Sequence, residues 1–264
     1  MNPVLKIEKL TKSFGGLTAV NGFALELAEH EIHGIIGPNG AGKTTVFNLI
    51  TGVYRPDSGH ILLEEKEIAN LPPDVISRSG IARTFQNIRL FSQMSVLDNI
   101  KVALHQRSNY RLWDVILGLK RFRSQEKVIA KESLEYLEYF GLTNRHNEVA
   151  GSLSYGEQRR LEIARALATH PKVLLLDEPA AGMNPREVED LISFIRKIHH
   201  DFGLAILIIE HQMPVIMDLC THVQVVDFGQ TIAAGDPETV TNDPLVIRAY
   251  LGEEEVEEHE ASGN

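Results

Sequence analysis

Cysteine and long apolar runs are almost missing from this sequence. Its 264 residues include one cysteine, Cys220, which excludes an internal disulfide. The longest aliphatic stretches, VLLL at 173–176 and AILII at 205–209, are far shorter than the ~20 residues that a membrane-spanning helix needs. Because the N-terminus also lacks a signal-like stretch, we expect a cytoplasmic protein that does not cross a bilayer by itself.

Basic residues are outnumbered. The chain has 26 Lys and Arg against 36 Asp and Glu, which gives a formal net charge of −10. An acidic chain argues against nucleic acid as the main partner. Part of the excess lies in the tail, EEEVEEHEASGN at 253–264, which has six glutamates and no lysine or arginine. We expect this tail to be a solvated, disordered end.

Short apolar stretches that alternate with amphipathic ones indicate an α/β fold. Residues 4–8 and 23–36 are predicted as strands separated by KSFGGL, and strand character continues over 58–68. From residue 157 onward, helical patterns alternate with continuously apolar strands, which is typical of a parallel sheet covered on both faces. Such sheets bind ligands at the carboxyl ends of their strands.

Between about 95 and 155 the pattern is helical. Apolar residues recur at the i, i+3, i+4, i+7 spacing of one helical face at Leu112, Val115, Ile116 and Leu119. A second helix is predicted over about 124–140, with Gly141 as its cap. This stretch is predicted to be a helical insertion, and it divides the chain into 1–94, 95–155, 156–252 and the tail 253–264.

The stretch GPNGAGKTT carries the strongest local signal. Three glycines within six positions are unfavourable to order unless the backbone needs positive φ or a very close approach by another group. The pattern Gly-x-x-x-x-Gly-Lys-[Ser/Thr] follows an apolar strand and opens a helix. Such loops turn amide hydrogens toward phosphates, with the lysine on the β- and γ-phosphates, the hydroxyl on Mg²⁺ and the helix dipole beneath. The predicted triphosphate site comprises Gly37, Pro38, Asn39, Gly40, Ala41, Gly42, Lys43, Thr44 and Thr45.

Two carboxylates end the apolar strand in VLLLDE. Burying the carboxylate of Asp177 at the end of a strand is unfavourable unless a cation or hydrogen bonds compensate its charge. Mg²⁺ on the nucleotide would supply that cation. Glu178 would point elsewhere and could take a proton from the attacking water or orient it. An acidic helix cap is the alternative for both. These motifs predict an α/β fold of the P-loop NTPase (RecA-like) class, with a parallel-sheet core, an N-terminal antiparallel β subdomain and the helical insertion.

Two further stretches have the pattern of helix starts. Ser154, in LSYGEQRR, fits an N-cap, although a cap alone does not need the tyrosine, glycine and glutamine around it. Asn184 is followed by Pro185 at N1 and Glu187 at N3, which is a good capping sequence.

The order of GPNGAGKTT, Gln86, LSYGEQ, VLLLDE and His211 resembles the ATP-binding subunits of ABC transporters over residues 4–252. The resemblance implies that Ser154 and Gly156 bind the γ-phosphate of an ATP held by the opposite subunit. Gln86 would then touch Mg²⁺ or the lytic water, and His211 would contact the γ-phosphate.

Other positions follow or depart from the pattern of that family. Phe14 matches the aromatic residue that stacks on adenine, with a small hydrophobic anchor as the alternative. Tyr155 and Glu157 stand where the usual motif has a second glycine and a glutamine, and Asn184 stands where many relatives carry aspartate. Capping alone would explain Asn184.

The resemblance implies an ATPase that closes head to tail on ATP, as a homodimer or a heterodimer with a paralogous ABC ATPase. It would drive integral-membrane permease subunits and lie through them on the inner face of the cell membrane. The stretches GIARTFQNIRLF, DEPAAGMNP, IIEHQM and AYLG most resemble ATPases of branched-chain amino-acid uptake, which work with a periplasmic solute-binding protein. Urea or amide importers and lipopolysaccharide export are close alternatives.

Readings outside transport fit less well. ABC-type ATPases that act on DNA split the core with heptad coiled coils or zinc-binding cysteines, and neither is in the sequence. A P-loop kinase would not explain LSYGEQ. The expected permease contact is the helical insertion, with an exposed helix face that touches nothing as the alternative; its marked residues are Trp113, Arg107, Arg111, Lys120, Arg121 and Arg123.

Overall fold

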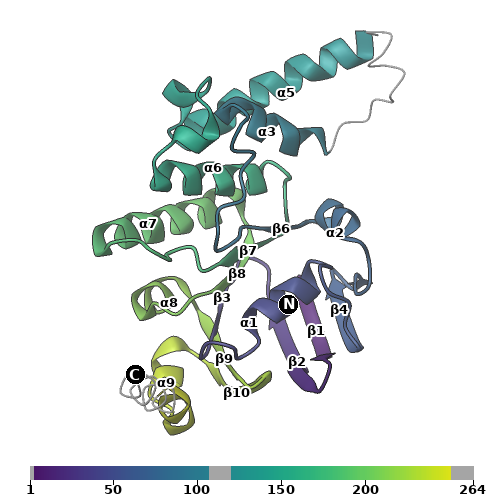
Figure 1. The fold of residues 1–264 in the computed structure, drawn as a ribbon, viewed down its shortest axis with the longest axis vertical. Helices are drawn as coiled ribbons and strands as arrows, with labels where there is room; N and C mark the ends of the chain where they lie inside the picture. Colours follow the sequence, from purple (N-terminus) through teal and green to yellow (C-terminus); the bar gives the residue numbers. More distant parts are fainter. Residues whose placement is uncertain (1–2, 107–119, 251–264) are drawn as a thin grey trace. The chain divides into compact units, whose positions relative to one another are not determined.

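The computed structural model describes residues 3–106 and 120–250 (Figure 1). It divides into two compact units. Unit 1 comprises Met1–Arg83 and Lys172–Asn264, and unit 2 comprises Thr84–Pro171. The predicted helical face at 112–119, the residues Arg107, Arg111 and Trp113, and the acidic tail lie outside the described residues.

Unit 1 begins with an antiparallel sheet. Its strands, in spatial order, are β2 (Leu17–Leu27), β1 (Leu5–Phe14), β4 (Ser58–Leu63) and β5 (Lys66–Glu67). β1 buries Leu5, Ile7 and Leu10 and leaves most of the positions between and after them at least partly open to solvent. One face of such a sheet can meet water. The predicted strand over 4–8 was therefore too short, because the polar residues that seemed to end it belong to the open side.

Two other strand predictions were wrong at turns. The expected strand over 23–36 is two strands, because residues 28–31 form a turn in which the Ala28 N–H donates to the Glu31 carboxylate at 2.8 Å. The expected strand over 58–68 is a hairpin, in which Glu64 and Glu65 have φ of 47° and 66°. Two successive residues with positive φ are typical of the tight turn that joins hairpin strands.

The second sheet of unit 1 has six strands. In spatial order they are β10 (Gln230–Gly235), β9 (His222–Asp227), β3 (Ile32–Ile36), β8 (Ala205–Ile209), β7 (Val173–Asp177) and β6 (Ile81–Arg83). All neighbouring pairs are parallel except β10 with β9. Every residue of β3, β7 and β8 is buried, as expected for strands covered on both faces.

Helices follow these strands as the alternating pattern predicts. The helices of unit 1 include α1 (Lys43–Ile50), α2 (Pro73–Ser79), α7 (Pro185–Phe202), α8 (Met213–Leu219) and α9 (Pro237–Thr241), and residues 244–250 are also helical. α7 starts at a full capping box, in which the Asn184 side chain accepts from the Glu187 N–H and the Glu187 carboxylate accepts from the Asn184 N–H. The expected fold class, with a parallel core and an N-terminal antiparallel sheet, is confirmed.

Unit 2 is helical in the part that the structure describes. Its helices are α3 (Val96–His105), α5 (Lys120–Tyr139) and α6 (Tyr155–Leu167), with short 3₁₀ turns at Thr143–Arg145 and Ala150–Ser152. α3 packs against both α5 and α6. α5 begins before the predicted start near 124, and Gly141 behind its end has a φ of 67°. The subdomain boundaries at 94 and 155 stay predictions.

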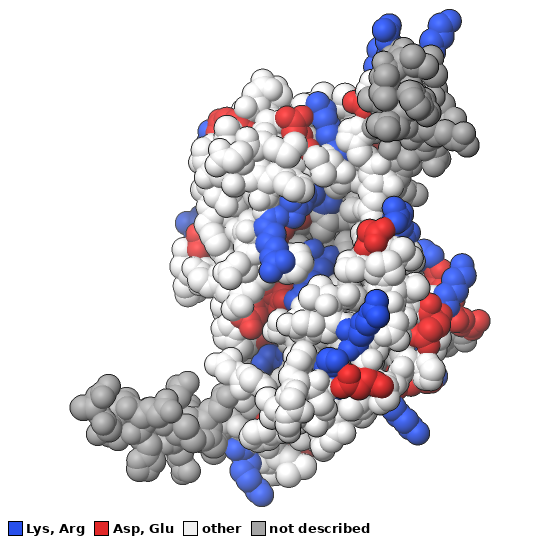
Figure 2. Space-filling model, turned by 45° about the vertical axis from the view of Figure 1, so that its right-hand side comes forward, with Lys and Arg blue, Asp and Glu red and all other residues white. Residues whose placement is uncertain are grey.

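On the face shown in Figure 2, Lys and Arg side chains lie among Asp and Glu side chains and do not form one large patch of a single sign. Among the residues that the structure describes, no helix combines the length and apolar character that a membrane span requires.

Candidate functional site

The predicted phosphate-binding loop connects β3 to α1. Gly37 has a φ of 145°, and a Cβ added there would lie 1.9 Å from the Val226 carbonyl oxygen. Gly42 has a φ of 103°, and its added Cβ would lie 2.2 Å from the Ala19 carbonyl oxygen. The sequence predicts a close approach to this backbone, and at these two glycines the approaching group is a carbonyl of the same chain. At exposed Gly40 an added Cβ meets nothing within 4 Å, so that part of the loop is open.

Lys43 holds the loop in its curved form. Its side chain is buried, and its Nζ donates to the carbonyl oxygens of Gly37 at 2.5 Å and Pro38 at 2.6 Å. The loop therefore bends around the ammonium group. Thr44, the next residue of α1, is exposed.

The carboxyl ends of three adjacent strands meet beside this loop. Asp177, the last residue of β7, pairs in register with Ile209 of β8, and Ile209 pairs with Ile35 of β3. Two residues after Ile35 the chain reaches Gly37. Parallel sheets place ligand sites at such ends.

The buried charge of Asp177 is compensated by a cation of the chain itself, Arg83, which was not predicted from the sequence. The Arg83 Nη2 lies 2.6 Å from the Asp177 Oδ2, and both side chains are 5% exposed. Arg83 Nη1 also donates to the Asn48 Oδ1 at 2.8 Å. Within residues 3–106 and 120–250, no group of three or more His, Cys, Asp or Glu is placed to hold a metal ion. The hydroxyl of Thr44 and the carboxylate of Asp177 are nevertheless the oxygen donors that Mg²⁺ prefers beside phosphate oxygens, so the residues fit that ion.

Glu178 and His211 lie close together. The Glu178 Oε2 is 3.9 Å from the His211 Nδ1, with the two side chains 18% and 54% exposed. Glu178 has a φ of 44°, and its N–H donates to the Ile209 carbonyl oxygen at 2.9 Å. A glutamate in the left-handed region is strained, and strain of this kind concentrates at functional sites. The structure thus brings together two residues that the sequence places 33 positions apart.

The carboxylate of Glu210 connects the loop that follows Glu178 to the loop that contains His211. The Glu210 side chain is fully buried, and its carboxylate accepts from the N–H groups of Ala180 at 2.7 Å, His211 at 3.1 Å and Gln212 at 3.3 Å. The Gln212 side chain donates back to the Ala180 carbonyl oxygen at 2.9 Å. Burial raises the pKa of Glu210, an effect that these hydrogen bonds oppose. Glu210 was not predicted from the sequence, because its only signal there is an acid after an apolar strand.

Phe14 presents an accessible aromatic face. Its side chain lies at the end of β1 and is 43% exposed. The ring packs edge to face against Tyr54, with centroids 5.1 Å apart, and the Lys12 Nζ lies 5.4 Å from its centroid. This exposure suits a stacking platform better than a buried anchor, although its role stays a prediction. Tyr54 is a second aromatic residue here, and it was not predicted from the sequence.

Gln86, Ser154 and Gly156 belong to unit 2. Ser154 is the N-cap of α6: its Oγ accepts from the Glu157 N–H and donates to the Glu157 Oε2 at 2.8 Å. A Cβ added at Gly156 would meet nothing within 4 Å. The Gln86 carbonyl oxygen accepts from Arg159 of α6 at 3.0 Å. The predicted cap is confirmed, and the contacts of these residues with nucleotide stay predictions.

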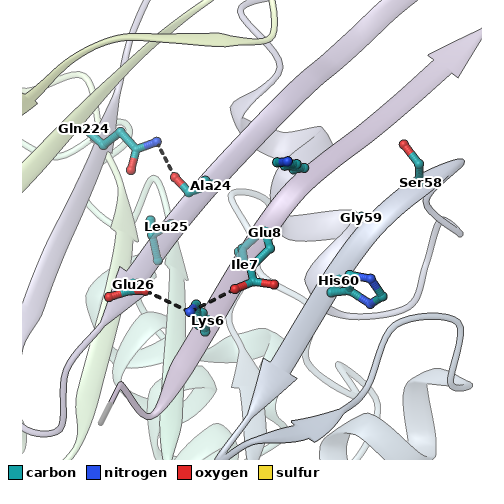
Figure 3. Close-up of a pocket in the computed structure, with 11 residues that line it drawn as sticks. Lys6, Ile7, Glu8, Ala24, Leu25, Glu26, Ser58, Gly59, His60 and Gln224 are labelled. Atoms are coloured by element: carbon teal, nitrogen blue, oxygen red, sulfur yellow. Dashed lines mark hydrogen bonds and ion pairs between the residues drawn. The ribbon is translucent and has the colours of Figure 1, made fainter. Parts of the chain in front are cut away.

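A separate hollow lies over the antiparallel sheet of unit 1. Figure 3 shows Lys6 between Glu8 and Glu26, with Nζ–Oε1 distances of 2.8 Å and 3.2 Å. The residues that line it come from β1, β2, β4 and β9, and none of them is a predicted site residue. Lys6, Glu8 and Glu26 thus pair with one another, and we assign no ligand to this hollow.

Comparisons with known proteins agree with the motifs. A family model described as ABC transporter matches residues 20–181, and one described as branched-chain amino acid ATP-binding cassette transporter matches residues 230–256. The chain is 45% identical to the high-affinity branched-chain amino acid transport ATP-binding protein BraF of Pseudomonas aeruginosa, over 95% of this chain and 98% of that protein. It is 46% identical to the protein LivG of Escherichia coli, described in the same words, with the same coverage.

A solved structure shows the same fold. The crystal structure of an ATP-binding cassette of an ABC transporter, in the ADP conformation, aligns with a TM-score of 0.82 and 32% identity, over 96% of this chain and all of that one. With the motifs, the fold and relatives of 45% identity and nearly full coverage, the chain belongs to the ATP-binding proteins of the ABC transporter family.

Proposed function

We propose that this ATPase supplies the energy for a membrane importer of branched-chain amino acids. The support comes from the relatives BraF and LivG, which are named for that transport and match nearly the whole chain. The match of residues 230–256 to a family model for the same transport class supports it independently of the nucleotide motifs.

In the proposed site each residue has a distinct role in binding or hydrolysing ATP. The loop at 37–45 holds the phosphates of ATP, and Phe14 stacks on the base. Thr44, Asp177 and Gln86 hold Mg²⁺, which neutralises phosphate charge when bound. Glu178 accepts the proton of the attacking water or orients it, and His211 contacts the γ-phosphate. The observation that carries the roles of Glu178 and His211 is the 3.9 Å approach of their side chains at strand ends that adjoin the loop.

The proposed working unit is a pair of chains. Ser154 and Gly156 of one chain cap the γ-phosphate that the other chain holds, because a helix N-terminus attracts an anion. ATP binds both halves and so favours the closed pair, and hydrolysis releases it. The partner is a second copy or a paralogous ABC ATPase. The pair docks on permease subunits at the inner face of the membrane, through the helical insertion, and a periplasmic binding protein delivers the solute.

The test of the hydrolytic role is Glu178→Gln. The variant keeps the shape of the side chain and loses its basicity, so we expect ATP binding to stay and turnover to fall by ~10²-fold or more. We also expect an ATP-bound dimer to accumulate, measured by size-exclusion chromatography with ATP. Turnover equal to that of the wild type would remove Glu178 from the mechanism. Lys43→Ala is the matched control, because it should weaken nucleotide binding itself.

The test of the transport role uses cells. Deletion of this chain should abolish uptake of labelled leucine, isoleucine or valine, and purification from membranes should yield co-eluting hydrophobic subunits. Uptake that stays normal while urea uptake fails, or co-elution with DNA, would identify one of the alternative functions.

A further inference from the structure

Helix α6 contains two charged side chains that are buried. Arg159 and Glu162 are each 1% exposed, and the Arg159 Nη1 lies 2.9 Å from the Glu162 Oε2. At i and i+3 they lie on the same side of the helix. Arginine and glutamate are almost never fully buried unless they are paired. Pairing with each other allows the two charges to be buried, and their other hydrogen bonds show which segment they hold.

Both residues also bind the backbone around Gln86. Arg159 donates from Nη1 to the Phe85 carbonyl oxygen at 2.8 Å and from Nη2 to the Gln86 carbonyl oxygen at 3.0 Å. The Glu162 Oε1 accepts from the N–H of Arg89 at 3.0 Å and from that of Phe85 at 3.4 Å. The pair thus makes four hydrogen bonds to the backbone of residues 85–89. These bonds run between α6 and a segment more than 70 residues earlier in the chain.

The start of the same helix is connected to the pair. The Arg159 Nη2 also donates to the Tyr155 hydroxyl at 3.0 Å, and its guanidinium carbon lies 5.7 Å from the centre of the Tyr155 ring. Tyr155 is one of the positions at which the sequence departs from the usual motif of its family. It directly follows Ser154, the N-cap of α6. The departure at Tyr155 therefore adds one more contact to the network around Arg159.

We propose that Arg159 and Glu162 are positioning residues that fix the backbone of Gln86 to helix α6, so that Gln86 and Ser154 move as one body during the ATPase cycle. This inference rests on the proposed roles of Gln86 and Ser154. Neither charged side chain touches nucleotide; they act through the peptide groups of residues 85–89. A displacement of about 1 Å at a reacting centre can lower a rate by about 10²-fold, so a fixed Gln86 backbone matters for turnover.

Two variants of the full chain test this. Glu162→Gln keeps the shape and one oxygen but removes the charge that faces Arg159. The double variant Arg159→Met with Glu162→Leu replaces the pair by apolar side chains of similar length, and such replacements of buried ion pairs are often neutral for stability. Both variants should keep the Kd for ATP within about twofold, because the phosphate-binding loop is unchanged, and should lower kcat by about tenfold or more with little change in KM.

Amide hydrogen exchange separates positioning from general loss of structure. In both variants the amides of residues 85–89 should exchange faster by about tenfold or more, whereas the amides of α5 keep their wild-type rates. The matched control is Glu135→Gln, which removes the same charge from an exposed ion pair with Lys131 on α5 and should change neither kcat nor exchange.

The outcomes distinguish this proposal from the one on which it rests. A folded double variant with wild-type kcat, or with unchanged exchange at residues 85–89, would overturn the positioning role. Gln86→Ala provides the second comparison. If that variant keeps wild-type turnover, the proposed role of Gln86 is wrong, while the exchange measurement still decides whether Arg159 and Glu162 hold the segment.

Discussion

Glu157 places a negative charge at the point where a phosphate is expected to bind. Its Oε2 accepts from the Ser154 N–H at 3.0 Å and from the Ser154 Oγ at 2.8 Å. The hydrogen bond from the Ser154 side chain lowers the pKa of Glu157 most, so the carboxylate is charged at neutral pH. The Arg145 Nε lies 3.3 Å from the Glu157 Oε1, and its positive charge offsets part of the carboxylate charge. The hydroxyl hydrogen of Ser154 is thus directed toward Glu157, and an incoming γ-phosphate must compete for it.

We therefore predict that Glu157→Gln strengthens ATP-driven pairing. Glutamine can still complete the capping box, while the repulsion between carboxylate and phosphate disappears. In a Glu178→Gln background the apparent affinity of the dimer should rise roughly tenfold at low ionic strength and less at high ionic strength, because salt screens exposed charges. Analytical ultracentrifugation with ATP measures this. Glu148→Gln, at the other carboxylate beside Arg145, is the control. Weaker pairing after Glu157→Gln would show that the carboxylate itself supports the contact.

Buried Glu210 makes the junction between the loops after β7 and β8 sensitive to pH. Because burial raises its pKa, the folded chain takes up the proton of Glu210 at a higher pH than the unfolded chain does. Stability follows the difference in bound protons, so this group contributes most below its unfolded value of about 4.5 and loses that contribution as pH rises through the folded pKa.

Glu210→Gln should remove this pH dependence. Its amide lacks one of the acceptor oxygens that face the three N–H groups, so the variant should be less stable by about 1–3 kcal/mol near pH 4.5. The difference in unfolding free energy between wild type and variant should shrink as pH rises above that value. Urea unfolding at a series of pH values measures it. Glu189→Gln, at an exposed position of α7, controls for the loss of one charge. A difference that grows with pH would contradict the assigned direction.

The sequence could predict those elements whose signals are local. The apolar strands β3, β7 and β8 and the capped starts of α6 and α7 are each specified by a few consecutive residues, and all were predicted. The full length of β1 was missed, because the polar residues on its open face resemble a loop. The turn at Glu64 and Glu65 was missed, because nothing in the sequence distinguishes these acids at positive φ from residues of a strand.

The candidate site divides in the same way. Lys43, Asp177 and Glu178 follow from short motifs. Arg83, Glu210 and Arg159 could not be predicted, because each works through a partner that is 30 or more residues away in the chain. Only the structure shows which backbone groups a buried charged side chain binds, and therefore which segments it holds together. The glycines show the same limit, since the sequence could not tell that Gly37 and Gly42 avoid carbonyls of their own chain.

The two halves of the proposed site belong to different units of the chain. The phosphate-binding loop is part of unit 1, and the helix start at Ser154 is part of unit 2. If each complete site takes its loop from one copy and its helix start from the other, a symmetric pair contains two such sites. A chain with a defective loop can then still complete a site for a partner whose loop is intact.

Complementation between two defective chains tests this arrangement. In a Glu178→Gln background, Lys43→Ala impairs the loop and Gly156→Glu places a negative charge at the helix start, where an added Cβ meets nothing within 4 Å and so should not disturb the fold. Neither variant alone should retain ATP, since every site in it has one defective half. In an equal mixture, half of the pairs combine the two chains and hold one intact site, so retained ATP should recover to about a quarter of the parent level. Filter retention of labelled ATP measures this. Retention no greater than the sum of the separate variants would mean that loop and helix start do not meet across the pair, whereas strong retention by either variant alone would show that its substituted residue is dispensable for the site.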